Sequence, residues 1–180
     1  ASCDSAIAIN PNDALAWNNR GFVLGSLHQN TEALDSYDKA IAINPSDPMA
    51  WSNRGMEQAN LGKFAESLSS CDKAIAIDPN YADAWNNRGV ALDGLRQHEE
   101  AIVAYEKAIE INPNLEKAWL NRGDTLRVLG RHPEQVDVDG SPSEDSKDSR
   151  HISPEVKSAV WERDNGKCVI CGSKTQLEFD

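Results

Sequence analysis

The chain has few of the features that mark membrane-spanning, secreted or disulfide-bonded proteins. Its 180 residues contain no apolar run near the roughly 20 residues that a transmembrane helix needs, and no signal peptide is evident. Only four residues are cysteines, and their spacing does not suggest a disulfide framework. We therefore expect no membrane partner and an intracellular, cytoplasmic location. Because the chain begins with Ala1 in the middle of a repeat, we also expect its natural N-terminus to be missing.

Basic residues are outnumbered, with 18 Lys and Arg against 29 Asp and Glu and a net charge of −11. Residues 150–180 contain five basic and five acidic residues, so the whole net charge falls on residues 1–149. An acidic surface repels nucleic-acid phosphates. Any contact with DNA or RNA must therefore come from the C-terminal segment.

Aromatic residues make up only 6% of the chain, but five of them are Trp, and four of these mark an internal repeat. Trp17, Trp51, Trp85 and Trp119 are 34 residues apart and open the strings WNNRG, WSNRG, WNNRG and WLNRG. A fixed period of this length is typical of stacked helical arrays. Such arrays present an extended surface that holds another protein rather than one that performs chemistry.

Each repeat reads as two helices. In the first helix a glycine follows the Trp by four residues, on the same side, where a partner helix can approach closely. The second helix carries small residues and an aromatic residue on one stripe, and an Asn-Pro or Asp-Pro pair ends it. Cys3 and Cys71 stand in the register of Tyr37 and Tyr105, which predicts buried thiols. The glycines are Gly21, Gly55, Gly89 and Gly123.

This pattern resembles the tetratricopeptide repeat, in which the same Trp, Gly, Ala, aromatic, Ala and Pro positions recur in order. The resemblance implies an all-α solenoid of stacked antiparallel helix pairs whose first helices line a concave groove. We assign residues 1–131 to this array and expect no cofactor there. Its parts are a partial unit 1–13, full units 14–47, 48–81 and 82–115, and the first helix of a further unit, 116–130.

Two polar positions recur beside each Trp. Asn19, Asn53, Asn87 and Asn121 form an in-register ladder, and an amide offers both a donor and an acceptor to a peptide backbone. A similar ladder lines the peptide groove of O-linked N-acetylglucosamine transferases, so we predict extended-peptide binding, with Phe22, Met56 and Val90 as apolar contacts. The alternative is that these asparagines are solvated residues inherited by duplication. The arginine after each of them favours a structural ion pair with an acidic residue of a neighbouring second helix, such as Asp38, Asp72 or Glu106.

The composition changes abruptly after the array. Residues 132–150 are rich in Ser, Asp, Glu, Pro and Gly and lack apolar periodicity, which predicts a flexible acidic linker. Residues 151–180 regain order, with a helix that Ser153 and Pro154 would begin, then the Cys168-Val-Ile-Cys171-Gly string and a short strand. Two cysteines across such a tight turn suit half of a tetrahedral zinc site.

The order of these C-terminal features closely resembles the opening of HNH-type endonucleases. By this resemblance Cys168 and Cys171 would be structural zinc ligands, and Asp180 would bind the catalytic divalent metal, such as Mg²⁺. The catalytic His and two further zinc ligands of that family are absent, so we expect this chain to be inactive as an enzyme. The alternatives are a chance Cys pair or a non-catalytic zinc knuckle.

Together these features lead us to expect a fragment of a longer protein. The repeat array would be a scaffold that binds a protein or peptide partner. The parent protein would be an HNH endonuclease that hydrolyses phosphodiester bonds of DNA or RNA through its complete C-terminal domain. The competing hypothesis is an interaction or adaptor protein without catalysis.

Overall fold

The computed structural model describes residues 2–130, which form eight α-helices joined by short turns. The predicted linker 132–150 and the predicted metal ligands Cys168, Cys171 and Asp180 lie outside the described residues. In chain order the helices are α1 (Ser2–Ile9), α2 (Ala14–Ser26), α3 (Asn30–Ile43), α4 (Pro48–Asn60), α5 (Phe64–Ile77), α6 (Ala82–Gly94), α7 (His98–Ile111) and α8 (Glu116–Val128).

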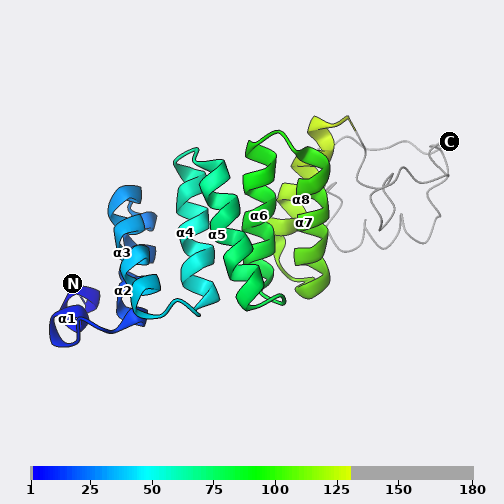
Figure 1. Cartoon of the computed structure of the whole chain (residues 1–180). Coiled ribbons are helices and arrows are strands. Elements are labelled where there is room, and N and C mark those ends of the chain that lie inside the picture. The colour runs from blue at the N-terminus through cyan, green and yellow to red at the C-terminus, as the bar shows by residue number, and fades with distance from the viewer. Residues whose placement is uncertain (1, 131–180) are drawn as a thin grey trace, which may run out of the picture.

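The helices stand side by side in one row from the N-terminal end to α8 (Figure 1). The first helices α2, α4 and α6 pack against the second helices α3, α5 and α7, and each second helix also packs against the next first helix. The predicted all-α helical solenoid is confirmed for this part of the chain.

Each repeat-marking tryptophan ties its helix to the end of the preceding repeat. The indole Nε1 donates a hydrogen bond of 2.9 Å to the main-chain carbonyl of the proline six residues earlier. Because that proline directly follows the end of a second helix, the bond fixes the turn into the next first helix. The four bonds run from Trp17 to Pro11, Trp51 to Pro45, Trp85 to Pro79 and Trp119 to Pro113.

The core is built from small residues that let the paired helices approach closely. A Cβ added to Gly21 would lie 2.7 Å from the ring of Tyr37, and one added to Gly55 would lie 2.7 Å from Cys71 Sγ. Such contacts are too close for any side chain larger than that of glycine. The predicted close approach is confirmed at these positions and at Gly89, which meets the Tyr105 ring.

The two cysteines of the array differ in burial. Cys71 is fully buried, as predicted, and burial raises the pKa of its thiol to about 12. Cys3 is only half-buried, because α1 packs mainly against α2. The expectation of a buried thiol is therefore wrong for Cys3.

Candidate functional site

The predicted peptide-binding residues lie on the first helices. We call the side of α2, α4, α6 and α8 that carries them the first-helix face. On α2 this face presents Leu15, Asn19 and Phe22, which share one side of the helix because they are four and three residues apart. Phe22 is 57% exposed. One repeat and two repeats later, Met56 and Val90 are half-buried at the same position.

The asparagine ladder forms hydrogen bonds between neighbouring first helices. Asn53 Nδ2 donates to Asn18 Oδ1 at 3.2 Å, and Asn121 Nδ2 donates to Asn86 Oδ1 at 3.0 Å. Each of these bonds joins two repeats, so the amides help to hold the first helices in register. The repeat pattern predicted either peptide binding or inheritance by duplication for these asparagines, and it did not reveal this structural role.

Asn87 is the most enclosed member of the ladder. It is buried, and its Nδ2 lies 3.1 Å from Ser52 Oγ and 3.3 Å from the Ser52 carbonyl oxygen. Asn19 is exposed, whereas Asn53 and Asn121 are half-buried. The signal that could have revealed these bonds is the polar residue just before three of the four asparagines, namely Asn18, Ser52 and Asn86.

The predicted ion pairs between repeats are confirmed. Arg54 Nε lies 2.6 Å from Asp38 Oδ1, Arg88 Nε lies 2.8 Å from Asp72 Oδ1, and Arg122 Nη2 lies 2.7 Å from Glu106 Oε1. Each pair joins a first helix to the second helix before it. A fourth pair at the N-terminal end joins Arg20 to Asp4 at 2.9 Å.

Two arginines also reach a buried hydroxyl of their own repeat. Arg20 Nη1 donates to Ser36 Oγ, and Arg54 Nη1 donates to Ser70 Oγ, both at 2.7 Å. The Ser70 hydroxyl lies 2.7 Å from the side-chain amide of buried Gln58. This cluster explains why a polar Gln58 is tolerated where the repeat pattern usually has an apolar residue: its amide has polar partners.

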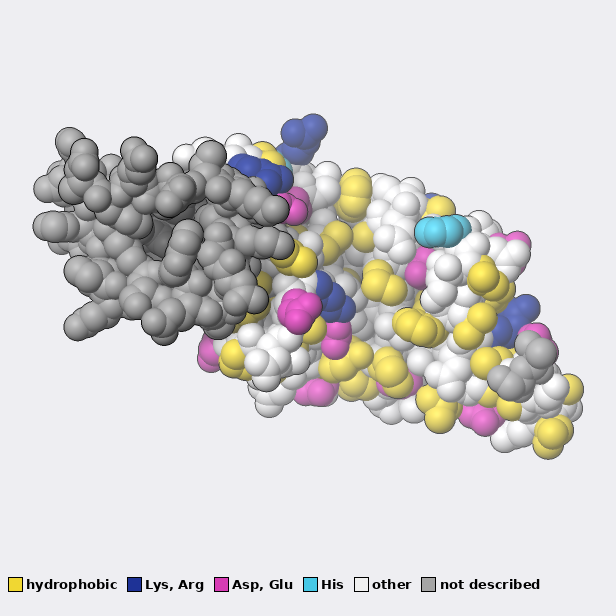
Figure 2. Space-filling view, turned by 180° about the vertical axis from the view of Figure 1, so that it is seen from behind, with side chains coloured by type: hydrophobic (Ala, Val, Ile, Leu, Met, Phe, Trp, Pro, Cys, Tyr) yellow, Lys and Arg dark blue, Asp and Glu magenta, His cyan; other side chains and the backbone are white. Residues whose placement is uncertain are grey.

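Charged residues replace apolar ones toward the C-terminal end of the first-helix face. Leu15 and Met49 of α2 and α4 are exposed, whereas Asp83 and Lys117 occupy the same position of α6 and α8. Asp83 Oδ1 and Lys117 Nζ form an ion pair of 2.5 Å across the two helices. In Figure 2, apolar side chains recur as separate patches between polar atoms from the N-terminal end, at the right, to the middle of the array.

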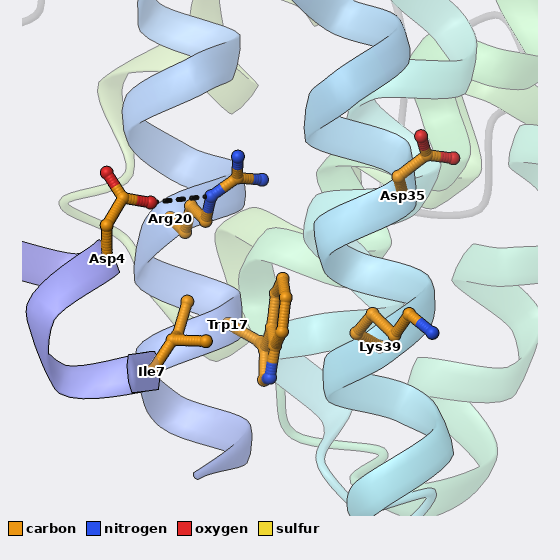
Figure 3. A pocket seen from close by; sticks show the side chains of 6 residues that line it. All are labelled: Asp4, Ile7, Trp17, Arg20, Asp35 and Lys39. Carbon is orange, nitrogen blue, oxygen red and sulfur yellow. Dashed lines mark hydrogen bonds and ion pairs between the residues drawn. The ribbon is translucent and has the colours of Figure 1, made fainter. Parts of the chain in front are cut away.

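An open pocket lies between α1, α2 and α3, at the N-terminal end of the array (Figure 3). Asp4, Ile7, Trp17, Arg20, Asp35 and Lys39 line it. Arg20 is already paired with Asp4 inside the pocket, and the lining carries charges of both signs. One repeat later, Lys73 Nζ lies 4.3 Å from the Trp51 ring centroid, in the register of Lys39.

Within residues 2–130, no cluster of three or more His, Cys, Asp or Glu side chains is arranged to hold a metal ion. Over the same residues, no helix combines the length and the apolar character needed to cross a bilayer.

Comparisons with known proteins agree with this architecture. A family model described as the tetratricopeptide repeat matches residues 14–47, 48–81 and 82–115, and a second model of the same description matches residues 104–137. None of the curated proteins searched matches the chain.

Several solved structures are similar to the array. The first repeat domain of Spaghetti (RPAP3), bound to the HSP90 peptide SRMEEVD, is 31% identical with a TM-score of 0.61, covering 65% of this chain and 93% of that one. The first such domain of human RPAP3 is 30% identical with a TM-score of 0.64, covering 67% and 95%. YrrB, described as having an unusual peptide-binding site, is 26% identical with a TM-score of 0.61, covering 72% and 67%.

Proposed function

We propose a function from the premise that this chain belongs to the tetratricopeptide repeat family: its array binds an extended peptide segment of a partner protein along the first-helix face. The observation that carries the proposal is the row of exposed and half-buried apolar and amide side chains on α2 and α4. Two similar structures add support, since one is a peptide complex and another is described by its peptide-binding site.

The asparagines can serve a peptide backbone while they hold the helices in register. An Asn amide has two N–H donors and one acceptor oxygen. Asn53 gives one N–H to Asn18, which leaves its second N–H and its amide oxygen for a ligand. Asn19 is exposed, so we assign it to peptide binding with Asn53 and Asn121, and we expect the buried Asn87 to contribute least.

A photocrosslinking experiment on the whole chain tests this proposal. A benzophenone side chain is placed at Phe22 or at Met56, on the first-helix face, and a random decapeptide library is added. The matched control places it at Val103, which is 55% exposed on the second helix α7. We expect peptides to be captured at residues 22 and 56. Failure to capture any peptide there, or equal capture at residue 103, would overturn the proposal.

A nuclease role of a longer parent protein is a second proposal, and it rests on the sequence of residues 151–180 alone. In it, Cys168 and Cys171 would bind structural zinc, and Asp180 would bind a divalent metal such as Mg²⁺, once further ligands complete the domain. The test is metal-dependent cleavage of plasmid DNA and of RNA by the product of the gene read through codon 180. Cleavage that is lost when a downstream His is changed to Ala supports the role, and absence of cleavage of both plasmid DNA and RNA refutes it.

We also propose that the protein acts inside the cell. Cys3 and Cys71 are free thiols in the structure, which suits a reducing compartment. Selective labelling of the native protein in intact cells would locate it.

A further inference from the structure

We propose that the first-helix face selects an uncharged segment with large apolar side chains, and that it rejects acidic peptides such as the one bound by Spaghetti (RPAP3). This inference rests on the proposed function, since it specifies the chemistry of the peptide that the same face would bind.

The charge arrangement of the first helices gives the first argument. Lys and Arg side chains occur at six positions of α2, α4, α6 and α8, and each forms an ion pair with a carboxylate of the array. The pairs are Arg20–Asp4, Arg54–Asp38, Arg88–Asp72, Arg122–Glu106, Lys117–Asp83 and Arg127–Asp124. An incoming carboxylate would therefore have to compete with an internal one for every cation on these helices.

Lys117 shows what that competition involves. It stands on α8 in the register of Leu15, which places it on the first-helix face, and its Nζ lies 2.5 Å from Asp83 Oδ1. A peptide carboxylate that took Lys117 would leave the Asp83 carboxylate beside it without its cation. Like charges so placed repel each other, and an acidic protein also disfavours the approach of an acidic ligand. The peptide SRMEEVD carries three acidic side chains, so this face suits it poorly.

The apolar residues give the second argument. Leu15 is 56% exposed and Phe22 is 57% exposed on α2, while Met49 is exposed and Met56 half-buried on α4. Leu15 and Met49 occupy one repeat position, and Phe22 and Met56 occupy another. Two adjacent helices thus present four large apolar side chains in two rows. Large apolar side chains exposed in these two rows suit an apolar ligand, and methionine side chains adapt readily to different partners.

The spacing of the helices sets the expected spacing of apolar residues in the peptide. Packed helices have axes about 8–10 Å apart, and an extended chain advances about 3.3 Å per residue. A peptide that crosses α2 and α4 therefore places apolar side chains over both helices when they are two or three residues apart. On α6 and α8 the Asp83–Lys117 pair takes the repeat position of Leu15 and Met49, so beyond α4 only the other apolar row continues, with the half-buried Val90.

The peptides captured in the crosslinking experiment provide the test, because their sequences report the preference of the face. We expect enrichment of Leu, Ile, Met or Phe at two- or three-residue spacing, and depletion of Asp and Glu. Enrichment of acidic peptides would overturn this inference and leave the proposed function standing. Capture of no peptide at residues 22 and 56 would overturn both.

Synthetic peptides then give the affinity. For the most enriched uncharged peptide, we expect Leu15→Ser combined with Met49→Ser to weaken binding at least tenfold, and Val103→Ser to leave it unchanged. We also expect affinity to stay constant or rise between low and high salt, since apolar contacts are not screened. Binding of SRMEEVD at equal or greater affinity, or equal loss with Val103→Ser, would refute the proposed selectivity.

Discussion

Arg54 on the first helix of one repeat bonds to Asp38 on the second helix of the repeat before it, with 2.6 Å between Nε and Oδ1. The same guanidinium donates to buried Ser70 of its own repeat and lies 5.8 Å from the centroid of the Trp51 ring. Three successive helices, α3, α4 and α5, therefore meet at one side chain. Repeat arrays are stabilised by contacts between neighbouring repeats, so we expect this arginine to stabilise the array.

Arg54→Ala should lower the unfolding free energy by about 1–2 kcal/mol, because it removes the hydrogen bond to buried Ser70 as well as the ion pair. Asp38→Asn is the matched control. It removes only the half-exposed ion pair, so it should cost about 0–1 kcal/mol. Urea unfolding followed by circular dichroism measures both. Equal losses in the two variants would contradict the role assigned to the Ser70 bond.

Gly21 and Gly123 occupy the same repeat position in different surroundings. A Cβ at residue 21 would lie 2.7 Å from the Tyr37 ring, whereas a Cβ at residue 123 meets no atom of the described part within 4 Å. Gly21→Ala should therefore destabilise the fold by about 1–3 kcal/mol through overpacking. Gly123→Ala should stabilise it by about 0.5–1 kcal/mol, because alanine is the better helix former. Thermal unfolding of the two variants checks both signs, and a shift of the same sign in both would contradict the argument.

Much of this fold follows from the repeat period, and the reason is physical. The interactions that recur every 34 residues are local or join adjacent repeats, so the positions of Trp, Gly and Arg already indicate their partners. The sequence therefore predicted an ion pair of Arg88 with an acidic residue of a neighbouring second helix, such as Asp72, and the close approach of the partner helix at Gly89.

The finer contacts of the face could not be predicted in this way. Whether an amide such as Asn53 faces a ligand or a neighbouring helix depends on the angle by which each repeat is rotated from the one before it. The spacing of residues in the repeat does not determine that angle. The bond from Asn53 to Asn18 became evident only in three dimensions. The binding role of the ladder stays a prediction.

Tyr37 carries a buried hydroxyl that has no hydrogen-bond partner among the described residues. Removing an unsatisfied hydroxyl removes a desolvation penalty. Tyr37→Phe should therefore leave stability unchanged or raise it by about 1 kcal/mol. The control is Tyr105→Phe at the equivalent position of the third repeat, where burial raises the pKa of the hydroxyl and the Thr125 side chain opposes that rise; this change should cost about 0.5–1.5 kcal/mol. A clear loss in Tyr37→Phe would show that its hydroxyl has a partner after all.

Glu57 should make the stability of the array depend on pH. It is only 2% exposed, and burial raises the pKa of its carboxyl above the ordinary value of 4.5, against the opposing effects of Asn60 and His28. The folded chain thus binds this proton more tightly than the unfolded chain. The stabilisation from protonation is complete below pH 4.5 and is lost as the pH rises through the folded pKa.

Replacing Glu57 by Gln tests this pH dependence, because Gln is uncharged at every pH and has nearly the same shape. Glu57→Gln should raise the unfolding free energy at pH 7, where burial of the wild-type carboxylate costs free energy, and the two chains should converge as the pH falls below 4.5. Glu116→Gln on α8 is the control, because Glu116 is exposed. Urea unfolding of the three chains between pH 4 and pH 8 measures the effect. A difference between Glu57→Gln and wild type that stays constant over this range would mean that the carboxyl does not titrate differently in the folded state.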